Sequence, residues 1–270
     1  MTFMDDIKST WAKKNSLLCV GLDTDLGRIP EQLRKKDKPL FEFNRAVVDA
    51  TADLVCAFKP QIAYYAASGS EDELEMTVEH IHKNYPGTPV ILDAKRGDIG
   101  ATATMYAKEV FDRYKADAVT VNPYLGFDSL EPFLERKEKG IIILCRTSNP
   151  GAKEIQDLEV NGKKLYQIIA RMAMERWNHH GNVLLVVGAT YPLELKEIRS
   201  IVGEIPFLVP GIGAQGGDVQ RAVTNGKDST GTGMIINSSR GIIYASQGPD
   251  FENAARSAAK SLRDEINQYR

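Results

Sequence analysis

The stretch Asp93-Ala-Lys-Arg-Gly-Asp98 holds the residue types in this chain that are best suited to proton-transfer chemistry. It follows the apolar run 89–92, which is typical of a buried strand. Alternate residues of a strand face the same side, so we expect Asp93 and Lys95 to point together, with Asp98 just beyond the strand. Two carboxylates around one ammonium would keep a lysine charged and aimed. The alternative interpretation is an ordinary ion pair, with Asp98 acting only as a helix N-cap.

A second lysine favours the catalytic interpretation. Lys59 interrupts an apolar run, and the following Pro60 favours extended backbone at Lys59. Lysines are rarely buried in strands unless they are paired, and a closed barrel has no edge at which a lysine could reach solvent. We therefore predict a network of alternating charge, in which the lysines keep their protons. Its members are Asp23, Lys59, Asp93 and Lys95.

A glycine-rich segment predicts a phosphate site. Pro210-Gly-Ile-Gly-Ala-Gln-Gly-Gly-Asp218 follows an apolar run and precedes a helical pattern. Such a loop can offer backbone N–H groups to a phosphate. Arg240, after Ser238 and Ser239, adds a guanidinium suited to bidentate phosphate contacts. The alternative is that the glycines only form a tight turn.

Apolar, β-branched runs alternate with segments of helical spacing, which indicates a parallel sheet. Eight such units predict an α/β fold, a (β/α)₈ TIM barrel that forms one catalytic domain over residues 1–270. An extra N-terminal helix at 4–14 is expected to cover the barrel bottom, and the polar segment 149–162 to be an insertion on the active-site face. Strands are expected at 17–23, 57–62, 90–95, 118–122, 141–147, 183–188, 207–211 and 234–238. Helices are expected at 41–54, 71–84, 102–114, 164–177, 193–202, 218–224 and 250–268.

Composition narrows the class of protein. The 270 residues carry a net charge of −2, with no broad basic surface for nucleic acid or anionic membrane. No apolar run approaches the roughly 20 residues of a membrane span, and the N-terminus does not resemble a signal peptide. Three cysteines inside apolar runs predict reduced, buried thiols in a cytoplasmic protein. The histidine pairs 80/82 and 179/180 lack the spacing of a helical zinc site, so no metal is expected. A Mg²⁺ ion bound by carboxylates is the alternative that the sequence does not exclude.

Together these motifs resemble the orotidine 5′-monophosphate decarboxylase family. The resemblance runs from Asp23 to Arg240 and rests on Asp93-x-Lys95-x-x-Asp98-Ile99-x-x-Thr102, on the 210–218 segment and on Phe58-Lys59. It implies a (β/α)₈ barrel, usually a homodimer with active sites shared at the subunit interface. The implied reaction converts orotidine 5′-monophosphate to uridine 5′-monophosphate and CO₂, the last step of de novo UMP biosynthesis, without metal or organic cofactor.

The resemblance also implies roles for single residues. Lys95 matches the proton donor, Asp93 the carboxylate that faces the substrate carboxylate, and Lys59 the lysine that touches the ribose and both aspartates. Asp98 and Thr102 match residues that reach into the neighbouring subunit's site. Ser148 matches a serine at the pyrimidine edge, Asp23 a ribose ligand, and Gln215 and Arg240 phosphate ligands. The full set of implied substrate-binding residues is Asp23, Thr102, Ser148, Pro210, Gln215, Gly216, Ser239 and Arg240.

The chain departs from the family pattern in places. Arg146-Thr147 replaces the more usual acidic-Met pair, and the segments 28–38 and 149–162 are longer than in compact members, which indicates a longer bacterial-type branch. Two alternatives stay open. One is a Mg²⁺-dependent phosphosugar decarboxylase or aldolase of the same superfamily, related to 3-keto-6-phosphogluconate decarboxylase or hexulose-phosphate synthase. The other is a catalytically silent nucleotide-binding or scaffold protein.

Overall fold

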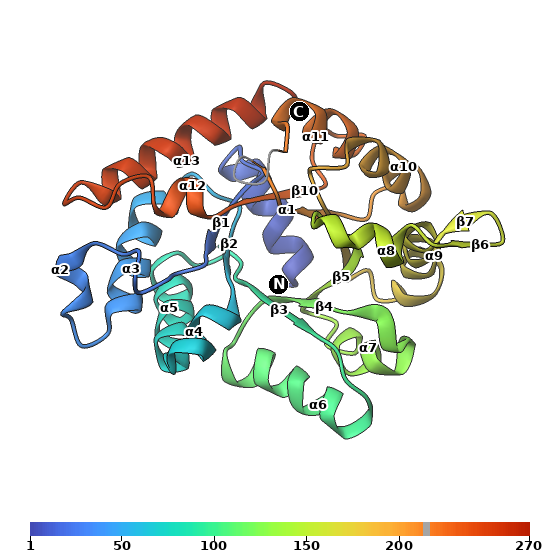
Figure 1. Ribbon diagram of the computed structural model, residues 1–270, viewed down its shortest axis with the longest axis horizontal. Helices are drawn as coiled ribbons and strands as arrows, with labels where there is room; N and C mark the ends of the chain where they lie inside the picture. Colours follow the sequence, from blue (N-terminus) through green and yellow to red (C-terminus); the bar gives the residue numbers. More distant parts are fainter. Residues whose placement is uncertain (213–216) are drawn as a thin grey trace.

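Eight parallel strands form a barrel in the computed structural model, which describes residues 1–212 and 217–270 (Figure 1). The strands follow the order β2-β1-β10-β9-β8-β5-β4-β3, and isolated parallel bridges between Phe58 and Val90 and between Gln61 and Asp93 join β2 to β3. The ring is thereby closed, and the predicted (β/α)₈ barrel is confirmed. The barrel strands are β1 (Leu18–Leu22), β2 (Ala57–Pro60), β3 (Ile91–Arg96), β4 (Ala118–Val121), β5 (Gly140–Arg146), β8 (Val183–Val187), β9 (Phe207–Val209) and β10 (Met234–Ser238).

The strands are apolar on both faces because both faces are covered. Every residue of β1, β4 and β8 is buried, since one face lines the barrel interior and the other packs against helices. This is why the sequence shows continuous apolar runs rather than alternation. The pattern changes in β3, where burial decreases after Asp93. The polar residues of β3 therefore begin at the point where the strand extends beyond the buried part of the barrel.

Helices surround the barrel, and each helix buries the side chains along one of its faces. For example, Phe43 of α3 stacks on Phe251 of α13 at a centroid distance of 5.4 Å, so the first and last large helices lie side by side. The larger helices are α3 (Pro39–Thr51), α5 (Glu71–Asn84), α6 (Gly100–Lys108), α7 (Phe127–Leu134), α9 (Leu165–Met172), α10 (Pro192–Val202), α11 (Val219–Gly226) and α13 (Phe251–Asn267). Shorter helices are α2 (Glu31–Arg34), α4 (Ile62–Ser68), α8 (Lys153–Gln156) and α12 (Arg240–Ile243). Single turns of other helix types are η1 (Glu109–Arg113), η2 (Pro123–Leu125), η3 (Pro150–Ala152) and η4 (Ala173–Trp177).

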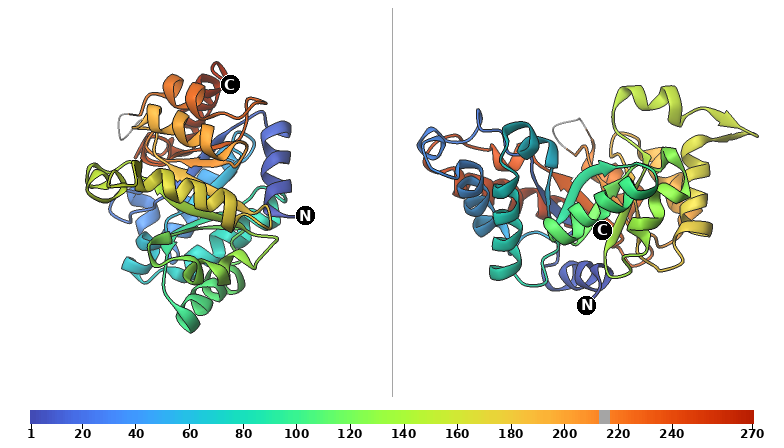
Figure 2. Two further views of the ribbon diagram at one scale, coloured as in Figure 1. Left: turned by 90° about the vertical axis from the view of Figure 1, so that its right-hand side faces the viewer. Right: turned by 90° about the horizontal axis from the view of Figure 1, so that it is seen from below.

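The N-terminal helix α1 (Phe3–Lys13) covers the end of the barrel where the strands begin, as predicted (Figure 2). The Phe3 N–H donates to the Glu138 carbonyl at 2.8 Å, and the Thr10 hydroxyl donates to the Cys56 carbonyl at 3.0 Å. The Phe3 ring also occupies the space that a side chain at Gly140 would need, 2.4 Å from an ideal Cβ. Both carbonyls lie just before a barrel strand begins. Helix α1 therefore covers the end of the barrel that is opposite to the carboxyl ends of the strands.

The segment after β5 has more structure than a polar insertion requires. It forms η3, α8 and an antiparallel hairpin of β6 (Glu159–Val160) and β7 (Lys163–Lys164) before α9 begins (Figure 2). The expected helix at 102–114 starts earlier, at Gly100, and ends as the π-helix η1. Helices α2, α4 and α12 were not predicted, because four to seven residues carry too little periodicity to recognise.

The three cysteines, Cys19, Cys56 and Cys145, are free and buried. Burial raises the pKa of the Cys56 thiol to about 12, and it raises the pKa values of the other two thiols as well. Within 1–212 and 217–270, no helix is long and apolar enough to cross a bilayer.

Candidate active site

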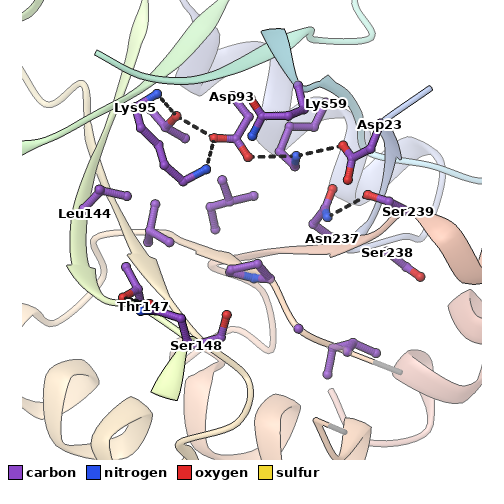
Figure 3. Close-up of a pocket in the computed structure, with 18 of the residues that line it drawn as sticks. Asp23, Lys59, Asp93, Lys95, Leu144, Thr147, Ser148, Asn237, Ser238 and Ser239 are labelled. Atoms are coloured by element: carbon purple, nitrogen blue, oxygen red, sulfur yellow. Dashed lines mark hydrogen bonds and ion pairs between the residues drawn. The ribbon is translucent and has the colours of Figure 1, made fainter. Parts of the chain in front are cut away.

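Four charged side chains meet where β1, β2 and β3 end (Figure 3). The Asp93 carboxylate lies between two ammonium groups, with Oδ2 3.0 Å from Lys59 Nζ and Oδ1 2.7 Å from Lys95 Nζ. Lys59 Nζ also lies 3.7 Å from Asp23 Oδ1. The predicted network of alternating charge is therefore present in the order Asp23, Lys59, Asp93, Lys95.

Strand register explains why the charges meet. Gly21 pairs with Lys59 across β1 and β2, and Gln61 bridges Asp93 across β2 and β3. The side chain of Lys59 is only 4% exposed, and burial alone would lower its pKa. The nearby carboxylates of Asp93 and Asp23 outweigh burial and raise the Lys59 pKa above its ordinary value. Both partners of the pair thus stay ionised inside the protein.

Asp93 shows the complementary effect. Its burial would raise the carboxyl pKa, but the charges of Lys59 and Lys95 and their hydrogen bonds hold that pKa well below its usual range. Lys95 differs from Lys59 because its side chain is 47% exposed and extends into the open part of the cavity. One lysine is thus fixed in the wall, and the other is accessible to a ligand.

A threonine that the sequence analysis did not single out organises this end of β3. The Thr120 hydroxyl donates to Asp93 Oδ1 at 2.8 Å and accepts the N–H groups of Ala94 and Lys95 at 3.0 and 2.9 Å. Lys95 adopts a left-handed φ of +46°, and the β3–β4 register shifts between Leu92 and Arg96. A non-glycine residue in this region is strained, so the surrounding contacts must hold it there. Strand alternation correctly predicted that Asp93 and Lys95 lie together, but a local distortion sets their final geometry.

Asp98 and Thr102 lie apart from the cavity in this chain. They are absent from the described residues that line it, and Thr102 is exposed on α6. Asp98 is partly exposed, and its Oδ1 accepts the N–H of Ile99 at 2.8 Å. The N-cap position of α6 belongs to Ile99, so the alternative interpretation of Asp98 as that N-cap is wrong. Neither side chain therefore contributes to the lining of the cavity of its own barrel.

The charged network forms one wall of a cavity of about 560 Å³, a volume typical of a small-ligand site. Ser148 and Thr147 lie across the cavity from Asp93 and Lys59 (Figure 3). Apolar side chains also line the cavity, namely Leu144 of β5, Val186 of β8, Leu208 of β9 and Ile212 after β9. One side of the cavity is thus charged, and the opposite side is mixed apolar and hydroxyl-bearing.

Three more of the predicted residues line the cavity. Pro210, Ser239 and Arg240 line it, and Arg240 is exposed to solvent. The predicted residues Gln215 and Gly216 lie outside the residues that the structure describes. Beyond them, the Asp218 carboxylate accepts the Arg221 N–H at 2.8 Å and caps α11. The predicted order of strand, glycine-rich segment and helix is therefore present.

Two buried oxygens in this cavity have no hydrogen-bond partner within the described part of the chain. They are Asp23 Oδ1 and Asn237 Oδ1, and both residues line the cavity. Buried polar atoms are normally satisfied, so each of these oxygens can accept a hydrogen bond from water or from a ligand hydroxyl, and Asp23 Oδ1 also lies 3.7 Å from Lys59 Nζ. Asn237, like Gln61 and Gln156, was missed by the sequence analysis because an amide in a strand or loop carries no distinctive pattern.

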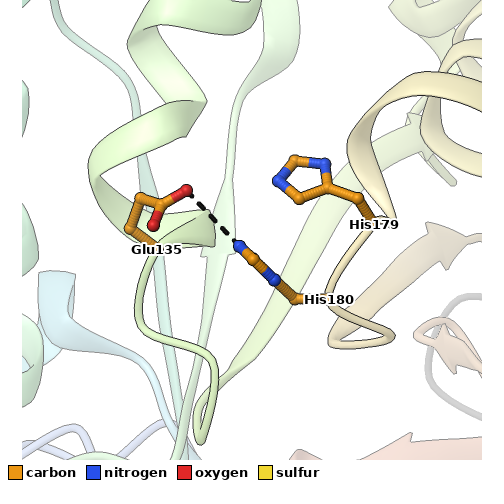
Figure 4. A group of neighbouring side chains, drawn as sticks. All are labelled: Glu135, His179 and His180. Atoms are coloured by element: carbon orange, nitrogen blue, oxygen red, sulfur yellow. Dashed lines mark hydrogen bonds and ion pairs between the residues drawn. The ribbon is translucent and has the colours of Figure 1, made fainter.

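A separate cluster could hold a metal ion. Glu135, His179 and His180 place one ligand atom each within 4.8 Å of one another (Figure 4). The sequence analysis considered the two histidines alone and expected no metal there. Glu135 lies 44 residues before His179 in the chain, so spacing could not bring it into consideration.

Comparisons with known proteins agree with the geometry. The family model "Orotidine 5′-phosphate decarboxylase / HUMPS family" matches residues 16–257. The orotidine 5′-phosphate decarboxylases of Ralstonia nicotianae and Dechloromonas aromatica are 57% and 58% identical over 270 residues, which cover all of this chain and all of each relative. The structure of Leishmania donovani OMP decarboxylase superposes with a TM-score of 0.86 at 37% identity, covering 100% of this chain and 98% of the other.

Proposed function

The chain belongs to the orotidine 5′-phosphate decarboxylase family, and we propose that Lys95 is the acid of its reaction. The reaction is the decarboxylation of orotidine 5′-monophosphate to uridine 5′-monophosphate. The observation that supports Lys95 most strongly is its 2.7 Å ion pair with Asp93 at the open side of a cavity that also holds Lys59.

The chemistry explains why such a lysine is needed. When the bond between C6 and the carboxylate breaks, CO₂ leaves and the electron pair stays on C6 in the plane of the ring. That pair cannot delocalise into the ring π system, so fixed charges in a cavity shielded from water must stabilise it. The ammonium of Lys95 stabilises the developing charge and then transfers one proton from Nζ to C6. The neutral amine regains its proton from solvent after the product leaves.

Asp93 acts chiefly by orientation in this proposal. Its two oxygens bind Lys59 and Lys95, and Thr120 fixes the same carboxylate. The Lys95 side chain has four rotatable bonds, so it loses entropy when it is held in one conformation. Asp93 holds it in that conformation before the substrate binds. Because both oxygens are already engaged, aiming Lys95 is the role that the contacts support best.

The cavity accommodates the three parts of the nucleotide. We assign the ribose hydroxyls to the unsatisfied oxygens of Asp23 and Asn237, since hydroxyls can donate to them. The pyrimidine edge is assigned to Ser148 on the opposite wall. The phosphate is assigned to Arg240, together with Pro210, Gln215, Gly216 and Ser239 of the same two loops. Binding energy from this remote phosphate can then be used to assemble the reacting end.

We also propose a homodimer with shared active sites, located in the cytoplasm. Asp98 and Thr102 do not line their own cavity, and they lie beside exposed apolar side chains. Ile99 is 59% exposed and Met105 is 61% exposed, a pattern expected of a surface that another subunit covers. Three buried, free thiols are consistent with a reducing compartment. One continuous hydrophobic cluster supports a single catalytic domain over residues 1–270.

An ultraviolet assay tests the function. Purified protein is mixed with orotidine 5′-monophosphate, and loss of the orotate absorbance is followed with and without excess EDTA. We expect equal rates in both. Turnover that EDTA abolishes would favour the Mg²⁺-dependent alternative. If the protein binds UMP but leaves orotidine 5′-monophosphate intact, it would be a nucleotide-binding protein without catalysis.

A further inference from the structure

Two histidines and a glutamate lie together at the end of the barrel opposite to the active site (Figure 4). His179 and His180 occupy the turn between η4 and β8, and Glu135 follows α7, just before β5. His180 Nε2 lies 3.4 Å from Glu135 Oε1, and all three ligand atoms lie within 4.8 Å of one another. The decarboxylation has no use for this cluster, because it lies where the strands begin.

These distances suit a divalent metal ion. Donor atoms about 2.1 Å from a tetrahedral Zn²⁺ lie roughly 3.4 Å from one another, which is the spacing already present between His180 and Glu135. His179 is exposed, and its ligand atom already lies within 4.8 Å of the other two. Two imidazoles and one carboxylate are a donor set that proteins use for Zn²⁺, with water as the fourth ligand.

The two segments that carry the donors are already held together. The buried Asn182 side chain donates to the carbonyls of Leu134 and Arg136, at 3.1 and 3.3 Å, on either side of Glu135. On the other side of the turn, the Val183 N–H donates to Asn178 Oδ1 at 3.0 Å. Backbone positions are therefore fixed before any ion binds, which reduces the entropic cost of binding.

One histidine is also oriented as a ligand should be. His179 Nδ1 lies 3.4 Å from the Arg176 carbonyl, so a proton on Nδ1 leaves Nε2 free to donate its lone pair. Metal-binding histidines commonly donate their other N–H in this way. We propose that Glu135, His179 and His180 bind a divalent transition-metal ion, represented by Zn²⁺, that links α7 to the start of β8.

Calorimetric titration of the full-length protein with ZnCl₂ at pH 7.5 tests this site. We expect one Zn²⁺ per chain and a higher thermal unfolding midpoint with Zn²⁺ than without it. His180→Gln and Glu135→Gln should each weaken binding at least about tenfold, because losing even an outer-shell partner of a metal commonly has that effect. His82→Gln is the matched control, since His82 is paired with Asp117 outside this cluster and should leave binding unchanged.

Either of two results would overturn the metal proposal. The first is absence of Zn²⁺ binding at micromolar concentration. The second is binding that His180→Gln and Glu135→Gln leave intact, or that His82→Gln removes equally. Far-ultraviolet circular dichroism of each variant separates loss of the site from loss of the fold.

A different observation concerns Arg146, which is fully buried beside the active-site cavity. Its guanidinium lies 4.0 Å from the ring centroid of Tyr191, and it donates to the Thr147 carbonyl and Gln156 Oε1, both at 3.3 Å. Its Nη2 pairs with Asp157 Oδ2 at 3.3 Å. A buried charge without partners would be costly, so this set of contacts fixes the segment that supplies them.

That segment forms the wall opposite to the catalytic lysines. Gln156 Oε1 accepts the Thr147 N–H, and Gln156 Nε2 donates to Thr147 Oγ1, both at 2.9 Å. Ser148, the residue after Thr147, packs closely against Gly188. A Cβ at Gly188 would lie 2.9 Å from Ser148 atoms. Thr147, Ser148 and Gln156 all line the cavity.

From these contacts we infer that Arg146 is a positioning residue for recognition of the base. It anchors α8 and the following turn, so that Ser148 and Gln156 face the pyrimidine. The inference rests on the proposed function, because it assumes that the base lies against this wall. The insertion after β5 thereby gains a role in specificity.

Binding of two ligands to one variant tests the inference. Arg146→Met should weaken UMP binding at least about tenfold, the effect of losing one well-placed hydrogen bond. It should leave the affinity for ribose 5-phosphate unchanged, because that ligand has no base. Arg146→Lys should recover part of the loss, since a single ammonium replaces only some of the contacts.

The inference would be overturned if Arg146→Met weakened the binding of both ligands equally, or weakened the binding of neither. If Arg146→Met does not fold, Asp157→Asn tests the same anchor from a partly exposed position. Turnover of orotidine 5′-monophosphate by the unaltered enzyme tests the proposed function separately. Failure of that assay and failure of the Arg146 inference therefore give different results.

Discussion

Replacing Asp93 by Asn removes the one anion that lies between two ammonium groups. The Asp93 carboxylate contacts Lys59 Nζ at 3.0 Å, Lys95 Nζ at 2.7 Å and the Thr120 hydroxyl at 2.8 Å. An amide of the same shape keeps the packing but not the charge. Among the residues that the structure describes, Lys59 would then have only Asp23, at 3.7 Å, to compensate its buried ammonium.

We expect Asp93→Asn to lower the free energy of unfolding by about 3 kcal/mol. Breaking a buried ion pair by removing one partner costs about 3–5 kcal/mol, and the remaining contact with Asp23 places this case at the lower end. The Lys95 pair adds little, because that side chain is 47% exposed and its charge is screened by solvent. Removing the stranded cation as well, in Lys59→Met/Asp93→Asn, should recover most of the loss.

The pH dependence gives a second test. The folded pKa of Asp93 is lowered, so its contribution is present above the unfolded pKa near 3.8 and is lost as the pH falls towards the folded value. The folded pKa of Lys59 is raised, so its contribution is present below 10.5 and is lost only as the pH rises through the folded value. The difference between wild type and Asp93→Asn should therefore be constant from about pH 5 to 9 and shrink below about pH 4.

Urea unfolding at one fixed protein concentration measures these differences, because dimer stability depends on concentration. Fluorescence of the buried Trp11 and Trp177 reports the transition. A loss below about 0.5 kcal/mol, within the range of an ordinary surface substitution, would refute the reasoning. So would a Lys59→Met/Asp93→Asn protein that is less stable than Asp93→Asn alone.

Three further predictions concern activity. Lys95→Ala should abolish turnover and shift the urea midpoint little, because the Lys95 side chain is about half exposed; near-normal decarboxylation in the ultraviolet assay would contradict its role as the acid. Arg240→Ala should lower UMP affinity and kcat/KM together by about tenfold to a hundredfold, the cost of a hydrogen bond to a charged group, and unchanged UMP binding by calorimetry would move the phosphate elsewhere. Equal mixing of inactive Asp98→Ala and Lys95→Ala chains should restore about a quarter of wild-type activity, since half of the dimers are then hybrids with one intact site; no recovery despite demonstrated subunit exchange would mean that Asp98 does not serve its partner.

The charged network was predictable because its signals are local. Lys59 lies within an apolar run before a proline, and Asp93 and Lys95 alternate at the end of a strand. Parallel strands bring their ends together, so neighbouring positions followed from the fold class alone. What the pattern could not predict was the φ of +46° at Lys95, which depends on a hydroxyl supplied by the next strand.

The residues that were missed depend on contacts between distant parts of the chain. Thr120 resembles any β-branched strand residue until its hydroxyl meets Asp93. Arg146 was recognised only as a departure from the family pattern, because its burial against Tyr191 depends on a segment 45 residues later. Glu135 joins two histidines through the packing of α7 on the turn before β8. The periodicity of the sequence does not show which distant residues come into contact.

The bare cavity is close to electrical balance, and this affects how substrate arrives. Two ammonium groups are matched by two carboxylates in a chain of contacts, so seen from a distance they nearly cancel. Among the described residues that line the cavity, the remaining charge is the exposed guanidinium of Arg240, which attracts a nucleotide that carries several negative charges. Added salt should accordingly slow capture of the substrate at this outer position while leaving the inner lysines undisturbed.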